Sequence, residues 1–311
     1  MAGEWMFMNP MLRPLALVWG RLELPKWRGV LNRVAGWNHL HDAPRKRVKG
    51  KLHGFWMDLD LADWSDRWVY FLGRYYEGHT QLLFQLALRP GDTFVDIGAN
   101  IGMTTLCAAA LVRPEGRIVS FEPNPRVFER LKGHVAANGL ESIVELRNRG
   151  VADAPGELEL HVPRHTGQAS FALVHEEQPT EVHRVPVGVG DDELKGVAGG
   201  PMFIKIDVEG YECRVLQGLK GTLASRRPAV MTEVLPKHLI RAGSSVEELF
   251  ALMHGLGYEA YNVEYTDALW GWPGTLALRR LAGPQAKLSD DLLWLAKGSE
   301  HERRLGDLIV R

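Results

Sequence analysis

A glycine-rich turn between a predicted strand and a predicted helix is the first place where residue types suggest chemistry. Residues 94–105, FVDIGANIGMTT, place Asp96 in an apolar run and Gly98, Asn100 and Gly102 in the turn. Backbone amides at a helix N-terminus attract carboxylates and phosphates, and glycine lets the main chain approach a ligand closely. Asn tolerates the left-handed conformation that such a turn needs. Because the turn lacks the Gly-x-Gly-x-x-Gly pattern of nicotinamide sites, it predicts a nucleoside site of another kind; an ordinary strand-to-helix connection is the alternative.

An acidic residue ends the next predicted strand. Glu122 lies in SFEPNP, about 20 residues after the glycine turn, where nucleoside-binding sheets carry a carboxylate for the two ribose hydroxyls. Phe121 and Pro123 would supply an apolar wall for a base. Taken alone, an acid at a strand end is equally well a solvated cap, but beside the glycine turn it predicts a ribose-binding carboxylate.

Three charged residues interrupt a further apolar segment, FIKIDVEGYE. Lys205, Asp207 and Glu209 alternate along it, so on a strand they would share one side. Charges inside a central strand are costly unless they are paired or functional, and ligands bind over the carboxyl ends of the strands in open α/β sheets. We therefore expect a catalytic rim here, with a structural Lys–Asp ion pair as the alternative. Glu233, at the end of the next predicted strand, joins the candidates.

Seven predicted strands and the helices between them must position these residues. The strands are expected at residues 93–98, 117–123, 143–148, 202–209, 228–234, 258–264 and 292–297. The helices are expected at residues 101–112, 125–138, 210–226 and 245–256. This alternation is typical of an α/β fold with a mostly parallel sheet covered on both faces. Since no helix of normal length separates the last two strands, we expect them to form an antiparallel hairpin.

One large domain with an N-terminal extension is the expected organisation. Residues 1–78 are basic and rich in Trp and precede the repeating unit, so we expect them to pack on the core formed by residues 79–311. Short alternating pieces punctuated by Pro and Gly predict an antiparallel insertion at residues 157–190. Residues 266–289 are expected to form a loop near an acceptor site.

Composition and charge narrow the classes of function. The 37 Lys and Arg residues nearly balance the 38 Asp and Glu residues, so no global basic field points to nucleic acid. The two cysteines are far apart in sequence, which argues against a disulfide framework or a Cys-based metal site. No uncharged run reaches the roughly 20 residues that a transmembrane helix needs. We therefore expect a soluble, cytoplasmic protein.

Taken together, four segments resemble the signature motifs of the FkbM-type family of S-adenosylmethionine-dependent methyltransferases. They are DTFVDIGANIG, FEPNP, KIDVEGYE and RPAVMTEV. The resemblance extends from Tyr70 to Ala296 and implies a seven-stranded, Rossmann-like class I methyltransferase sheet with an antiparallel last strand. It also implies S-adenosyl-L-methionine as the cofactor. Since members of this family methylate hydroxyl groups of sugars, glycans or natural products, a hydroxylated small molecule or saccharide is the implied acceptor.

The same resemblance assigns roles to individual residues. It implies cofactor binding by Glu77, Asp96, Gly98, Ala99, Asn100, Gly102, Glu122, Pro123, Asn124, Asp153 and Asp207. The turn from Asp96 to Gly102 matches the loop that receives the methionine part, and Glu122 matches the ribose acid. Asp153 ends NRGVAD, which resembles the family segment N-x-A-V-x-D and departs from it at Arg149 and Gly150.

Methyl transfer to a hydroxyl requires an acceptor oxygen held in line with the methyl group and a base within hydrogen-bond reach. Asp207 and Glu209 are the first candidates for this base, and Glu233 is a reserve. Lys205 would favour their ionised forms or orient the acceptor. We expect no metal centre; a divalent ion bridging Asp207 or Glu209 and a vicinal diol is the lesser alternative.

Other classes of protein stay open at this stage. An NAD-dependent oxidoreductase on a related sheet is disfavoured by the glycine pattern. A nucleic-acid methyltransferase is disfavoured by the near-neutral charge and, for base methylation, by the lack of a [DN]PPY-like segment. A cofactor-binding protein without turnover stays open. The basic residues 42–51 predict a solvated linker or a grip on an anionic substrate or acidic carrier protein. The Trp-rich start offers surface for a homodimer or a sugar ring.

Overall fold

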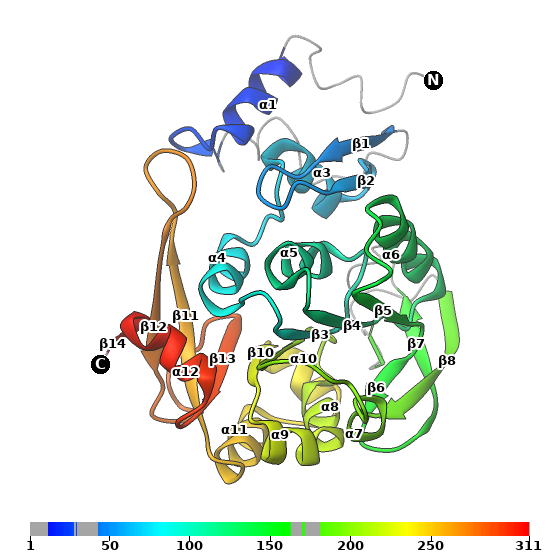
Figure 1. Cartoon of the computed structure of the whole chain (residues 1–311), viewed down its shortest axis with the longest axis vertical. Helices are drawn as coiled ribbons and strands as arrows, with labels where there is room; N and C mark the ends of the chain where they lie inside the picture. Colours follow the sequence, from blue (N-terminus) through cyan, green and yellow to red (C-terminus); the bar gives the residue numbers. More distant parts are fainter. Residues whose placement is uncertain (1–11, 28, 30–42, 163–169, 172–180, 311) are drawn as a thin grey trace. The chain divides into compact units, whose positions relative to one another are not determined.

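The protein divides into two compact units in its computed structural model (Figure 1). The structure describes residues 12–27, 29, 43–162, 170–171 and 181–310. The first unit comprises Met1–Leu82 and Tyr265–Thr275, and the second comprises Leu83–Glu264 and Leu276–Arg311. Almost all of the predicted sheet lies in the second unit.

A nine-stranded sheet forms the centre of the second unit. Its strands are β3 (Thr93–Ile97), β4 (Arg117–Phe121), β5 (Val144–Arg147), β9 (Met202–Ile206), β10 (Ala229–Glu233), β11 (Tyr258–Thr266), β12 (Thr275–Arg280), β13 (Asp291–Ala296) and β14 (Ile309–Val310). They lie in the order β14-β12-β11-β13-β10-β9-β3-β4-β5. The strands from β10 to β5 pair in parallel, whereas β13 runs antiparallel to β10 and β11. This confirms the predicted Rossmann-like α/β fold with a reversed last strand.

Two strands that were not predicted extend one edge of this sheet. The prediction of a loop at residues 266–289 is wrong for 275–280, which form β12, and β14 pairs with β12 in parallel. The sequence of β12, TLALRR, places two buried leucines on one face, as in a strand with one covered side. Its two arginines are exposed and form ion pairs with glutamates of β11. The alternation of buried and exposed residues in β12 is short, and it directly follows the turn-like sequence WGWPG, so it was read as part of a loop.

Helices cover both faces of the sheet, as predicted. They are α5 (Met103–Val112), α6 (Pro125–Ala137), α8 (Glu212–Gly218), α9 (Lys220–Arg226) and α11 (Val246–Gly255). The helices α5 and α6 lie on one side, and α8, α9 and α11 lie on the other (Figure 1). The single helix predicted at residues 210–226 is divided at Leu219 into α8 and α9. Because both faces are covered, β3 and β9 are buried along their whole length.

A three-stranded sheet forms a separate hydrogen-bonded layer in the second unit. It contains β6 (Gly150–Ala152), β7 (Gly156–Val162) and β8 (Glu181–Val189), in the order β6-β8-β7. The strands β7 and β8 pair antiparallel within the insertion predicted at residues 157–190. Residues 163–169 and 172–180 of that insertion lie outside the described residues. After β8, the short helix α7 (Gly190–Glu193) begins.

The first unit is built around aromatic side chains. Its elements are α1 (Leu12–Arg21), β1 (Arg45–Lys49), β2 (Trp56–Asp60), α3 (Trp64–Leu72) and the first part of α4 (Gly78–Ala87). Trp27 and Trp68 pack edge to face with ring centroids 5.7 Å apart. Glu23 is buried in an ion pair with Arg74. Trp27 and Trp68 therefore belong to a core of this unit, whereas Trp19 and Trp56 are exposed.

The predicted N-terminal extension differs from this unit in two respects. The unit ends after Leu82 rather than residue 78, and residues 265–275 belong to it. Packing of the extension on the core stays a prediction. The basic segment is not a linker, because Arg45 and Arg47 lie in β1 and pair with aspartates of the antiparallel strand β2. Trp5, Trp37 and Asp42 lie outside the described residues.

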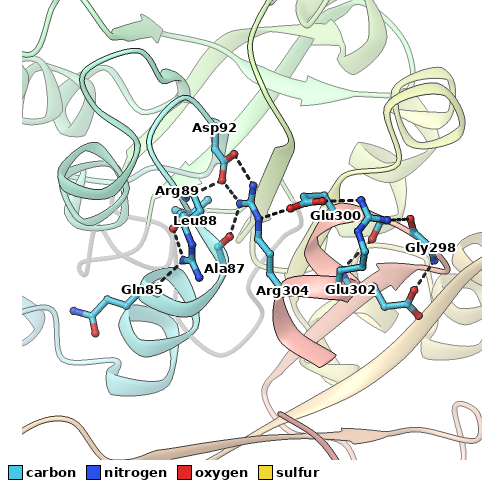
Figure 2. A network of polar contacts seen from close by, with 11 residues as sticks. Gln85, Ala87, Leu88, Arg89, Asp92, Gly298, Glu300, Glu302 and Arg304 are labelled. Carbon is cyan, nitrogen blue, oxygen red and sulfur yellow. Dashed lines mark hydrogen bonds and ion pairs between the residues drawn. The ribbon is translucent and has the colours of Figure 1, made fainter. Parts of the chain in front are cut away.

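The last helix is joined to the beginning of β3 by a buried ion pair (Figure 2). Arg304, in α12 (Glu300–Leu305), donates to the carboxylate of Asp92, to the carbonyl of Ala87 and to Glu300. Asp92 is 1% exposed, and it also accepts a hydrogen bond from the backbone amide of Arg89. Breaking such a pair on one side leaves a buried charge, so this contact stabilises the C-terminal end of the chain on the sheet. Among the described residues, no helix is long and apolar enough to span a bilayer.

Candidate active site

The turn after β3 adopts the left-handed conformation at three positions. Gly98, Asn100 and Gly102 have φ values of 84°, 50° and 90°, so Asn100 does take a glycine-like conformation. A Cβ on Gly98 would lie 1.9 Å from the backbone oxygen of Asp207, and one on Gly102 would lie 2.5 Å from Cδ1 of Leu131. Both glycines therefore make room for other parts of the chain. The sequence-based explanation for these two glycines was close approach of the main chain to a ligand. The contacts show close approach to other segments of the protein instead.

Glu122 follows β4, and its buried carboxylate binds the turn. Its Oε2 accepts a hydrogen bond from the backbone N of Asn100 and its Oε1 accepts one from the backbone N of Asn124, both at 2.8 Å. Asn124 also caps α6, because its side chain accepts from the backbone N of Arg126. Burial raises the pKa of Glu122 to about 7, although both amide hydrogen bonds favour the charged form.

The polar atoms around Glu122 fit a nucleoside ribose. An ionised carboxylate offers about four acceptor positions, and the two amides use two of them. Two adjacent hydroxyls would occupy the others. Within the described part of the chain, the Nδ2 donor of Asn124 is buried without a hydrogen-bond partner. Asn148 fixes the strand end from behind, since its Nδ2 donates to the carbonyl oxygen of Glu122 at 2.8 Å.

Asp96 anchors the first turn of α5 to the sheet. Its Oδ2 accepts hydrogen bonds from the hydroxyls of Thr104 and Thr105 at 2.8 and 2.7 Å. Its Oδ1 is buried and has no hydrogen-bond partner among the residues that the structure describes. Burial raises the pKa of Asp96, and the positive charge of Lys205, opposite it on β9, acts in the other direction. One oxygen of this buried carboxylate therefore remains for a ligand or water.

The charged residues predicted to lie on one strand do not do so. The strand β9 ends at Ile206, so only Lys205 belongs to it, and Asp207 and Glu209 lie in the turn that follows. Glu209 has a φ of 54°, which breaks the alternation on which the prediction of a shared side rested. Lys205 is 3% exposed, and its Nζ lies 2.7 Å from Oδ2 of Asp207. The ion pair that was the alternative explanation is therefore present, at the carboxyl edge of the sheet.

A second group of acids lies at the same edge. Glu233 ends β10 and is in register with Asp291 of β13. Burial, together with repulsion from Asp207, Glu209 and Asp291, raises the pKa of Glu233 to about 11. Without a compensating positive charge, this carboxyl is therefore protonated at neutral pH.

His238 joins these acids from the short helix α10 (Pro236–Arg241). Its Nδ1 lies 2.8 Å from Oε2 of Glu209. His238 was not predicted from the sequence. The available signal was its position soon after the end of β10, at the edge where Glu233 was already a candidate. Glu212 was also missed; its buried carboxylate accepts from the backbone N of Gly210 at 3.1 Å and holds the turn, and burial raises its pKa to about 7.

Four predicted cofactor residues have other surroundings. The backbone amide of Ala99 donates to the carbonyl of Phe121 at 2.9 Å, so Ala99 ties the turn to β4. The carbonyl of Pro123 accepts from the side chain of Asn148. Asp153 follows β6 and pairs with an arginine of α8 at 2.8 Å. Glu77 lies in the first unit, where it accepts from the hydroxyl of Thr80 at 2.9 Å. Their roles in cofactor binding stay predictions.

The strand order, with an antiparallel strand beside a parallel set, defines a Rossmann-like sheet of the class I methyltransferase type. The chain belongs to the FkbM methyltransferase family. The model of the methyltransferase FkbM domain matches residues 96–260, which are 165 of the 311 residues. The matched segment contains the glycine turn, Glu122 and the turn after β9.

Several known methyltransferases are similar to parts of the chain. A probable cobalt-precorrin-6B C(15)-methyltransferase (decarboxylating) from Halobacterium salinarum is 34% identical over 37% of this chain and 59% of that protein. The hexuronic acid methyltransferase AglP from Haloferax volcanii is 27% identical over 43% of this chain and 52% of that protein. The chain thus spans little more than half the length of these relatives. The crystal structure of an FkbM methyltransferase from Methylobacillus flagellatus KT is 16% identical, with a TM-score of 0.42, over 73% of this chain and 52% of that one.

Proposed function

We propose that the protein is an S-adenosylmethionine-dependent O-methyltransferase that acts on a hydroxyl group of a saccharide or another hydroxylated small molecule. Membership of the FkbM methyltransferase family supports the methyl transfer. The observation that carries the cofactor is Glu122, a buried carboxylate held by two amides with acceptor positions to spare for a ribose diol. S-adenosyl-L-methionine, when bound, supplies an electrophilic methyl group.

The residues around Glu122 would hold the cofactor. Glu122 accepts the ribose hydroxyls, and the turn from Asp96 to Gly102 receives the methionine part. The buried Nδ2 of Asn124 and the ring of Pro123 adjoin the ribose site and contribute to the site of the base. The proposal extends to Glu77, Ala99 and Asp153 only through the family resemblance.

The neighbouring edge of β9 and β10 would hold the acceptor. Asp207 or Glu209 takes the proton from the acceptor hydroxyl, since both carboxylates lie in the turn that ends β9. Lys205 orients Asp207 through their 2.7 Å ion pair. Glu233 is a weaker base candidate, because burial among other acids keeps its carboxyl protonated.

Calorimetric titration with S-adenosylhomocysteine and with NAD tests the cofactor. Saturation by the first compound alone supports the proposal, and saturation by NAD alone would replace it with an oxidoreductase on the same type of sheet. The acceptor is then sought by mass spectrometry after incubation with labelled S-adenosylmethionine and a panel of glycosides and natural-product alcohols. Hexuronic acids belong in the panel because AglP, one of the relatives, is named as a hexuronic acid methyltransferase.

The assigned carboxylates are tested by Asp207→Ala and Glu209→Ala. We expect both variants to keep their affinity for S-adenosylhomocysteine and at least one to lose methyl transfer. Full turnover in both would contradict a catalytic role for this turn, while leaving the cofactor site intact.

A further inference from the structure

Three potential metal ligands converge at the carboxyl edge of β9 and β10. Glu209 comes from the turn after β9, Glu233 from the end of β10 and His238 from α10. One ligand atom from each residue lies within 4.8 Å of the other two. The three come from different segments, so their convergence is a property of the fold and not of a local sequence motif.

The contact between Glu209 and His238 differs from an ordinary ion pair. Nδ1 of His238 is buried and, within the described residues, makes no hydrogen bond, although Oε2 of Glu209 lies 2.8 Å away. The two atoms are close but are not aligned as donor and acceptor. Two ligands at right angles, each about 2.1 Å from one ion, lie about 3 Å apart. The spacing of these two atoms therefore equals that expected of two ligands of one cation.

The surrounding backbone holds this arrangement in place. A Cβ on Gly210 would lie 2.4 Å from the carbonyl oxygen of His238, so glycine is what allows the turn after β9 to touch α10. The carbonyl of Glu209 accepts a hydrogen bond from the hydroxyl of Ser170 at 2.9 Å. The backbone that carries Glu209 and His238 is therefore held in place, which lowers the entropic cost of binding an ion there.

We infer that Glu209, Glu233 and His238 form a binding site for a divalent transition-metal ion. Binding of the ion would release the proton of Glu233, and the two carboxylates would then match the charge of such an ion. A set of two oxygen ligands and one imidazole nitrogen suits Mn²⁺ or Zn²⁺ better than Mg²⁺ or Ca²⁺, which prefer oxygen alone. Three protein ligands leave coordination positions open for a water or a substrate oxygen.

The role of this ion rests on the proposed function, whereas its binding does not. An ion here would bind an oxygen of the acceptor and lower the pKa of that hydroxyl. Glu209 would then act as a metal ligand, and Asp207 would be left to take the proton. A vicinal diol, common in saccharides, would offer two oxygens to the open positions.

The test is a titration of the full chain with Mn²⁺, followed by electron paramagnetic resonance, which detects free Mn²⁺ directly. We expect one Mn²⁺ to bind to the wild type. Glu233→Gln and His238→Gln are expected to weaken binding at least tenfold, since each removes one of three ligands but nearly preserves side-chain volume. His183→Gln is the matched control, because His183 also lies 3.0 Å from a carboxylate, that of Glu181, which pairs with Arg126 as well. This control should bind Mn²⁺ as the wild type does.

Two outcomes would overturn the inference. One is no uptake of Mn²⁺ by the wild type at millimolar concentration; the other is uptake that the control and the cluster variants share. Melting temperatures are measured with and without Mn²⁺ to distinguish loss of the site from unfolding of the variant. Mn²⁺ should raise the melting temperature of the wild type, and it should raise that of a folded Glu233→Gln by less. Titration of the wild type with S-adenosylhomocysteine in the same buffers separates this result from a failure of the proposed function, which would abolish nucleoside binding instead.

Discussion

Replacing Glu122 by Gln should weaken cofactor binding strongly while leaving the fold intact. The carboxylate accepts from the amides of Asn100 and Asn124 through different oxygens. In Glu122→Gln, one of these oxygens becomes an NH₂ group that faces an amide donor and can no longer accept from the ligand. Hydrogen bonds to a charged group contribute about 1.5–3 kcal/mol each. Losing one to the ribose and weakening the other therefore costs about 3 kcal/mol, or roughly a hundredfold in affinity.

The pH dependence gives the same prediction an independent readout. Burial raises the pKa of Glu122 to about 7 in the free protein. Ribose hydroxyls donate to the ionised form, so binding lowers this pKa, and the ligand must compete with a proton below pH 7. Affinity should thus fall with decreasing pH, by up to about tenfold per unit below pH 7. Glu122→Gln cannot take up that proton and should lack this dependence.

Isothermal titration with S-adenosylhomocysteine at pH 8 and pH 6 measures both effects. Glu145→Gln, an exposed glutamate on the neighbouring strand β5, is the control and should bind as the wild type does. Affinity of Glu122→Gln within threefold of the wild type at pH 8, in a protein with an unchanged melting temperature, would refute the assignment of the ribose site.

Three further predictions concern stability, measured as the free energy of unfolding in urea. Gly98→Ala should cost about 3 kcal/mol or more, because a Cβ would lie 1.9 Å from a backbone oxygen. The control Gly139→Ala, at φ 61° with nothing within 4 Å of the added Cβ, should cost only about 1–2 kcal/mol of left-handed strain. Equal losses of stability in the two variants would contradict the close approach at Gly98. Arg304→Gln should cost about 3 kcal/mol by leaving Asp92 buried without its cation, and a loss under about 1 kcal/mol would show that the pair is not buried. Burial lowers the pKa of His301 to about 4; the unfolded chain then binds the extra proton between about pH 6.5 and 4, so stability should fall by about 3 kcal/mol as the pH drops through that window. His301→Gln should lose less stability over the same range, and an identical acid profile would contradict a buried neutral imidazole.

Local sequence patterns were sufficient to predict most of the sheet. The apolar runs of β3, β4 and β9 are buried on both faces, so each stands out without knowledge of its neighbours. The helix predicted at residues 245–256 is α11, and Ser245 caps it because its side chain accepts from the backbone N of Glu248, three residues further on. Such signals depend on contacts within a few residues, and for that reason a single sequence contains them.

The site depended on contacts that no local pattern records. The alternation of Lys205, Asp207 and Glu209 suggested a longer strand, yet β9 ends at Ile206. Beyond it, Glu209 takes a positive φ and Gly210 lies against α10. His238 lies 29 positions beyond Glu209 in the sequence, and the two meet only through the pairing of β9 with β10. The glycines at turns were recognised from the sequence. Whether a ligand or another segment of the chain lies beside each glycine depends on the tertiary structure, which a local pattern does not record.

The order of the strands separates the two tasks that the site must perform. Glu122 follows β4 and Glu233 ends β10, with β3 and β9 between them. Neighbouring strands lie about 4.8 Å apart, so these two ends are separated by roughly 14 Å along the edge of the sheet. Substitutions at Glu122 should therefore act on cofactor affinity, and those at Glu233 should leave that affinity unchanged. The chain crosses from β5 to β9, on the other side of β3, and this crossover separates Glu122 from Glu233. On adjacent strands the two carboxylates would lie close together, and substitutions at either would affect both cofactor binding and turnover.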